Sequence, residues 1–423
     1  MYVSTEKKGE KKSTHQNFFY QPAGKQELPV LEYQLQQWRL LPLLAGAYAI
    51  DRFSRTLFEW YVEVQANLMS GDKSDRQAEL GKEIHAISSS SKPYASWFAR
   101  DTIQTCREAC GGHGYLAVNR LGTLREYALL FYYYFRGLTC HLVTMTLIAR
   151  TRATTRSCRS RRAISFWTFS SVLRMLFTFF FVPQSELFFA EVLKGSKIES
   201  PLGTFDFLGN FSEIIKSKSQ AQTAKDFMNP VHYLAAFDWI VCYRLAEAAQ
   251  YYKAQLRSGK DEFTARNDSQ VYNLRDVAMA YIERLIIFNF VDHIKNNGYD
   301  ASEIAVLQKL CDLFAVWSLE KQTSILFEGG YIGSVSQSKA IKEAARTLCT
   351  LLKDEAIALA DIIAPSDHVL HAPIGQSNGE AYKNLYNSMT TTPKALERAS
   401  FWQDFVEKPV PGSKRSVWAK SSL

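Results

Sequence analysis

The chain has 423 residues, 47% of them hydrophobic, which is enough apolar material to bury a large core, and its length predicts two domains. Its formal net charge of +8 does not predict a nucleic-acid partner, because the excess comes from one segment. That segment is a short run with six arginines: Arg150, Arg152, Arg156, Arg159, Arg161 and Arg162.

The cysteines and histidines exclude two further classes of protein. Seven cysteines, an odd number without regular spacing, argue against a disulfide framework and favour a reducing compartment. The eight histidines show no ligand spacing with a cysteine or a second pair, so no metal site is predicted. Residues 1–25 are rich in lysine and lack an apolar stretch, so we expect a disordered segment that is not a secretory signal.

Residues 26–125 predict the first part of a helical bundle. A helix from Leu28 to about Ser70 carries an apolar stripe that should face a core, formed by Leu31, Leu35, Trp38, Leu41, Ala45 and Tyr48. A second helix covers Arg76 to Ala109, and we expect the serines at 88–91 and Pro93 to loosen it. The two helices should form an antiparallel pair.

Three glycines, Gly111, Gly112 and Gly114, follow the second helix directly. Glycine allows positive φ angles and lets the backbone approach a ligand without a side chain in the way. Two interpretations stay open on this pattern alone. One is an ordinary helix C-cap, and the other is a loop that contacts a ligand.

Residues 126–189 change in character. An aromatic and apolar stretch, 127–149, is followed by the arginine run and by a second apolar stretch, 164–182. This order is typical of a membrane hairpin with a basic turn. Arg136, His141 and Arg174 lie inside the two stretches and count against that interpretation, because charged groups are costly in a bilayer.

Residues 190–412 predict a second helical domain. Three apolar stripes recur at helical spacing beyond Asn229: Leu234, Phe237, Val241, Leu245 and Ala248; Leu274, Val277, Tyr281, Leu285 and Phe288; Ile341, Ala345, Leu348, Leu352 and Leu359. Asn297 and Gly298 should end the second of these helices, and Pro365 follows the third. No credible alternating strand appears, so the predicted fold class is all-α, with two packed helical bundles.

The string from Cys106 to Ala117 closely resembles the loop of peroxisomal acyl-CoA oxidases, especially the branched-chain (pristanoyl-CoA) type. The segments at 28–42, 76–85, 262–267, 352–361 and 372–375 also resemble that family. The resemblance covers about 26–125 and 190–423 and corresponds to the C-terminal half of the family. It implies FAD as the cofactor, with Gly111, Gly112 and Gly114 as contacts to the flavin of a neighbouring subunit. It also implies Gln34 as a flavin contact, with a solvated surface glutamine as the alternative.

The family's catalytic glutamate lies in a Thr-Tyr-Glu-Gly-Asp-Asn motif that this sequence lacks, so no catalytic residue is assigned. For Val143 to Ser165, codons can be chosen so that the same bases also encode that motif in a second reading frame. This second frame starts at the third base of the first codon. We therefore interpret 126–189 as an anomalous insert produced by intron read-through and a frameshift. The sequence of the transcript tests this hypothesis, because a message with no open intron at these codons contradicts it.

The resemblance implies a function in peroxisomal fatty-acid β-oxidation. The family converts an acyl-CoA and oxygen into a 2-enoyl-CoA and hydrogen peroxide, and its members form homodimers. We expect this chain to be inactive by itself. Its tail, 413–423, ends in Ser421, Ser422 and Leu423, which resembles the Ser-Lys-Leu signal read by the peroxisomal import receptor. The alternatives are a non-catalytic helical partner of full-length oxidase subunits and a membrane-anchored helical protein.

Overall fold

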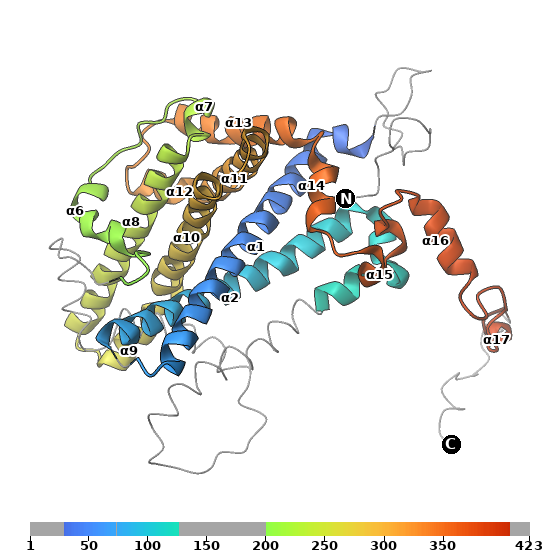
Figure 1. Ribbon diagram of the computed structural model, residues 1–423, viewed down its shortest axis with the longest axis horizontal. Helices are drawn as coiled ribbons and strands as arrows, with labels where there is room; N and C mark the ends of the chain where they lie inside the picture. The colour runs from blue at the N-terminus through green and yellow to red at the C-terminus, as the bar shows by residue number, and fades with distance from the viewer. Residues whose placement is uncertain (1–28, 73, 127–199, 407–423) are drawn as a thin grey trace, which may run out of the picture.

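The computed structural model describes residues 29–72, 74–126 and 200–406, which form helices and no strand (Figure 1). The N-terminal segment contains η2 (Val30–Glu32), α1 (Gln34–Met69), α2 (Asp75–Ala109), η3 (Gly111–Tyr115) and η4 (Ala117–Asn119). The second segment begins with η5 (Asp206–Asn210), α6 (Phe211–Ile214), α7 (Ala224–Phe227), α8 (Pro230–Arg257), α9 (Glu262–Asp268), η6 (Gln270–Leu274) and α10 (Arg275–Asn296). It continues with α11 (Ala301–Lys321), α12 (Thr323–Glu328), α13 (Val335–Leu352), α14 (Ala356–Ile363), α15 (Asp367–Leu370), η7 (Pro373–Gly375), α16 (Ala381–Thr390) and α17 (Trp402–Val406).

The all-α prediction is confirmed for the described ranges. Three predictions fall outside them: the disordered segment at 1–25, all but the first residue of the insert at 126–189, and the tail at 413–423. The membrane hairpin and the frameshift therefore stay hypotheses. Within the described ranges, every helix is too short or too polar to cross a lipid bilayer.

Helices α1 and α2 form the predicted antiparallel pair. Near their connection, the Gln77 side chain donates a hydrogen bond from Nε2 to the Val64 carbonyl at 2.9 Å. At the opposite end, Arg39 Nη2 of α1 lies 3.1 Å from Glu108 Oε2 of α2. Helix α2 begins one residue before the predicted start, at Asp75, because the Ser74 hydroxyl caps it by accepting a hydrogen bond from Gln77 N.

The expected loosening of α2 is wrong, because the helix is continuous through the serine run and Pro93. Each serine hydroxyl donates a hydrogen bond to a backbone carbonyl three or four residues earlier. Ser89 Oγ, for example, lies 2.8 Å from the His85 carbonyl oxygen. The hydroxyls are therefore satisfied within the helix and do not compete with its backbone ladder.

One continuous core joins the two helical segments. It includes buried side chains of α1, α8, α10, α11 and α13, among them Leu41, Ala45, Phe237, Ile287, Phe314 and Leu348. Gly46 of α1 leaves room for Phe98 of α2, because a Cβ there would lie 2.3 Å from Cζ of Phe98. Phe98 in turn meets Phe314 of α11 edge to face, with 6.3 Å between the ring centroids. Tyr94 Oη of α2 donates to Glu283 Oε1 of α10 at 3.0 Å.

Three residues of the predicted apolar stripes do not lie in the core. Leu35 is 67% exposed, Trp38 is 46% exposed and Phe288 is 41% exposed. Leu35 and Trp38 line an open groove at the start of α1. Phe288 instead packs under the guanidinium of Arg284, 4.7 Å from its ring centroid. Leu359 was assigned to the third stripe, but it belongs to the separate helix α14.

A buried carboxylate fixes the point where the second described segment begins. Glu83 of α2 is fully buried and accepts hydrogen bonds from Ser200 Oγ at 2.6 Å and from the Leu202 N–H at 3.1 Å. The backbone N–H of Thr204 donates at 3.3 Å, and the Thr204 hydroxyl donates as well. Four donors therefore converge on one side chain and hold residues 200–204 against α2.

We expect Glu83→Gln to lower the free energy of unfolding by about 3 kcal/mol, because an amide group replaces one acceptor oxygen and leaves buried donors unpaired. Urea denaturation measures the change. Glu79→Gln is the control at a partly exposed position of the same helix; it removes an ion pair with Lys82 and should change stability by about 0.5 kcal/mol or less. Equal effects of the two substitutions would contradict the role of Glu83.

A second buried carboxylate lies between α8 and α11. Tyr233 Oη donates to Asp312 Oδ1 at 3.1 Å, and Gln308 Nε2 donates to the same oxygen at 2.6 Å. Burial raises the pKa of Asp312 to about 7, although both hydrogen bonds act to lower it. The folded state therefore binds this proton more tightly than the unfolded chain does, for which the pKa of an aspartate is about 3.9.

The stability that protonated Asp312 contributes should be complete below about pH 4 and lost as pH rises to about 7, with no further loss above. In Asp312→Asn, a neutral side chain fills the site at every pH. We expect the stability of the wild type, measured relative to this variant by urea denaturation, to fall between pH 4.5 and 7.5. An unchanged difference across that range would contradict the assignment, and the exposed Asp361→Asn serves as the control.

Candidate flavin-contact site

The predicted glycine loop lies at the C-terminal end of α2. The helix ends at Ala109, and Gly111 has a φ of +58°, which is the left-handed conformation that closes many helices. The chain then forms the short helix η3. The interpretation of this loop as a helix C-cap is therefore confirmed, and it leaves the ligand-contact interpretation open.

Gly114 is required by the fold of the loop itself. It is buried, and a Cβ at this position would lie 1.9 Å from the backbone carbonyl oxygen of Arg107. Such a contact is impossible without movement of the helix backbone. Gly114 therefore allows η3 to fold back against the last turn of α2.

Gly111 and Gly112 lie differently. Both are exposed, and a Cβ at either position would meet no atom within 4 Å. At Gly112, whose φ is not positive, neither space nor backbone conformation in this chain explains a glycine. At these two residues the backbone is therefore open to a ligand, because no Cβ projects from it.

Several side chains that the sequence did not single out hold this loop. Arg107 Nε donates a hydrogen bond to the Gly114 carbonyl at 3.0 Å. Asn119 Nδ2 donates to the His113 carbonyl at 2.8 Å. The His113 ring contacts Tyr382 of α16 at 5.5 Å between centroids. These contacts join positions that are distant in sequence or depend on the loop's own fold, so no local pattern predicts them.

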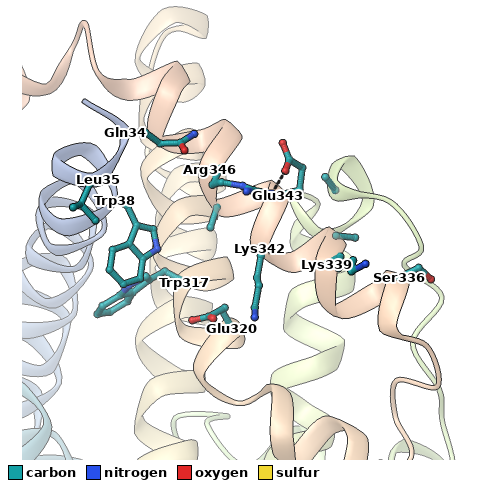
Figure 2. Close-up of a pocket in the computed structure, with 13 residues that line it drawn as sticks. Gln34, Leu35, Trp38, Trp317, Glu320, Ser336, Lys339, Lys342, Glu343 and Arg346 are labelled. Carbon is teal, nitrogen blue, oxygen red and sulfur yellow. Dashed lines mark hydrogen bonds and ion pairs between the residues drawn. The ribbon is translucent and has the colours of Figure 1, made fainter. Parts of the chain in front are cut away.

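Gln34 lies at the start of α1 and lines a groove of about 910 Å³ between α1, α11 and α13 (Figure 2). Trp38 and Trp317 form its aromatic side. Helix α13 contributes the charged residues Lys339, Lys342, Glu343 and Arg346, and the last two form an ion pair. Glu320 of α11 also lines the groove, so its charged side chains are three basic and two acidic.

The structure brings Gln34 and the glycines to the same end of the α1–α2 pair, where the Arg39–Glu108 ion pair joins the two helices. Their surroundings differ. Gln34 faces the groove with α11 and α13, whereas the glycine loop lies beside α16. Gln34 and the glycine loop therefore lie in separate surroundings at one end of the helix pair.

The thiols beside the loop are not reactive groups. Burial raises the pKa of Cys106 and the pKa of Cys110, so both stay protonated at neutral pH. Among the described residues, no three His, Cys, Asp or Glu side chains are grouped so that they could hold a metal ion.

Comparison with known families decides the lineage of the chain. A family model described as acyl-CoA oxidase matches residues 229–410, and a model described as the acyl-CoA oxidase C-alpha1 domain matches residues 11–134. The chain belongs to the acyl-CoA oxidase family. The two matched segments contain α8 to α16 on one side and α1, α2 and the glycine loop on the other.

Curated relatives agree with this family. Peroxisomal acyl-coenzyme A oxidase 3 of Homo sapiens is 41% identical over 396 residues, which is 93% of this chain and 52% of the relative. Acyl-coenzyme A oxidase acox-3 of Caenorhabditis elegans is 30% identical over 394 residues, 92% of this chain and 51% of the relative. The predicted resemblance to peroxisomal acyl-CoA oxidases is confirmed. The chain spans about half the length of the curated relatives it matches.

Solved structures show the same fold. Acyl-CoA oxidase 3 of Yarrowia lipolytica superimposes with a TM-score of 0.73 at 21% identity, covering 94% of this chain and 52% of that one. Acyl-CoA oxidase-1 of Caenorhabditis elegans, a complex with FAD and ATP, superimposes with a TM-score of 0.70 at 20% identity, covering 93% and 52%.

Replacement by alanine should affect the stability of the protein differently at the two kinds of glycine. Gly114→Ala should lower the free energy of unfolding by about 2 kcal/mol or more, because the new Cβ overlaps the Arg107 carbonyl. Gly112→Ala should change it by about 0.5 kcal/mol or less, because nothing lies within 4 Å of the new Cβ. Urea denaturation of both variants checks this. Equal destabilisation would show that Gly112 also has a structural role.

Proposed function

We propose that this chain supplies the helical, flavin-contacting half of a peroxisomal acyl-CoA oxidase that acts in fatty-acid β-oxidation. The observation that carries the proposal is the bare backbone at Gly111 and Gly112, held at the end of α2 within a segment that matches the family. The glycines are open to a ligand that comes from outside this chain, which fits a flavin carried by a neighbouring subunit.

The roles of the residues follow from their positions. Gly111 and Gly112 would let the loop backbone lie against the edge of FAD, and Gln34 would offer its side-chain amide at the start of α1. FAD, when bound, supplies the hydride acceptor that turns an acyl-CoA into a 2-enoyl-CoA, and oxygen then yields hydrogen peroxide. The protein's contribution here is to position the cofactor and to complete its binding surface.

We propose that these 423 residues have no oxidase activity by themselves. A carboxylate base must lie within hydrogen-bond reach of the substrate α-proton, and losing such a base typically costs about 10² to 10⁴-fold in rate. The family's carboxylate base lies in a motif that this sequence lacks, and no other residue is assigned to that role. The chain also covers only 52% of its human relative.

The chain is therefore proposed to act through association, as a homodimer or as a partner of full-length oxidase subunits. The exposed glycines provide a specific reason for this, because no described residue covers them. We propose the peroxisome as its location, since the relatives are named as peroxisomal and Ser421, Ser422 and Leu423 resemble the import signal.

Purified chain should release no peroxide when acyl-CoA is added and should retain little or no FAD. When it is mixed with a full-length peroxisomal acyl-CoA oxidase, the two should co-purify, and the complex should lose FAD more slowly than monomeric oxidase does. Flavin absorbance and a peroxide assay measure these outcomes. If the chain alone binds flavin and releases peroxide when acyl-CoA is added, the proposed inactivity is refuted. Failure to associate would refute the proposed partnership.

A further inference from the structure

Arg107 contacts the glycine loop in three ways from the last turn of α2. Its Nε donates a hydrogen bond to the Gly114 carbonyl at 3.0 Å. Its guanidinium lies 4.4 Å from the ring centroid of Tyr115. Its own carbonyl oxygen occupies the space that a Cβ of Gly114 would need. One residue therefore contacts both residues that follow the exposed part of the loop.

We propose that Arg107 is a positioning residue that fixes the conformation of Gly111 and Gly112 without touching the ligand. This inference rests on the proposed flavin contact of the loop. The loop residues from 111 to 113 are anchored at one end by α2 and at the other by Gly114 and Tyr115, which Arg107 holds. Without this second anchor, residues 111–113 are held only by α2 and by the contacts of His113 with Asn119 and Tyr382.

The planar guanidinium is essential to this role. A directed N–H from Nε reaches the carbonyl while the flat face of the group stacks on the Tyr115 ring, and a lysine ammonium cannot do both. A positive charge in the last helical turn also stabilises the helix through its dipole, and a lysine serves that purpose equally well. Arg107→Lys therefore separates positioning of the loop from stabilisation of the helix.

The first readout is hydrogen–deuterium exchange of the full chain without FAD. Arg107→Lys should leave the exchange of α2 unchanged and raise the exchange of residues 111–116 about tenfold, since a charge-assisted hydrogen bond is lost. The matched control is Arg100→Lys, on the same helix, where Arg100 pairs with Asp101 on the surface at 2.7 Å. This control should not change the exchange of the loop.

The second readout is the rate at which FAD leaves the complex of this chain with a full-length oxidase. Arg107→Lys should raise that rate about tenfold over the wild type, whereas Arg100→Lys should not change it. Arg107→Gln provides a second variant that keeps a planar side chain with an N–H donor, and it should show a smaller effect than lysine if it folds as the wild type does.

The outcomes separate the two proposals. Unchanged loop exchange in Arg107→Lys overturns the positioning role, whatever the flavin does. Raised exchange with an unchanged rate of FAD release also overturns it, since the arginine would then be structural only. If the wild-type chain itself does not slow FAD release, the proposed flavin contact fails, and the exchange data still decide whether Arg107 holds the loop.

Discussion

The burial of α1 and α2 against α10 and α11 is the interaction on which the rest of the structure depends. Gly46, Phe98 and Phe314 meet at its centre, and the small residue leaves room for the ring of Phe98. From Leu310 to Leu319, α11 is buried on nearly all sides, so this half needs partners around its whole circumference. The two segments matched by the family models are therefore parts of one core and stabilise each other.

This core determines where the last turn of α2 and the glycine loop lie. Because α1 and α2 are held rigidly along their length, the position of the last turn of α2 is fixed, and with it Arg107 and the glycine loop. One part of the loop, around Gly114, is packed tightly against the helix, while Gly111 and Gly112 stay bare. A well-anchored loop with an open backbone is the arrangement that the proposed contact with a cofactor of a neighbouring subunit would need.

Much of this could be predicted from the sequence, and the failures have physical reasons. The bounds of α2 were predicted to within one residue, because capping and periodicity are local signals. Helix α11 was not predicted, because its second half is buried on nearly all sides and so shows no amphipathic period. Leu35 and Trp38 follow the helical period of α1 but face a groove, which only the placement of α13 reveals. The glycine loop was recognisable as a motif, but the role of Arg107 depends on how the loop folds back.

Native-state hydrogen exchange at increasing urea concentration tests the central claim of a single shared core most directly. If α2 and α11 belong to one cooperative unit, their slowest amides should exchange with the same free energy of opening and the same dependence on urea. Separate opening of α1 and α2 at a clearly lower free energy than α10 and α11 would contradict the account. The two segments would then be independent bundles, and the packing of α10 and α11 would not fix the position of the glycine loop.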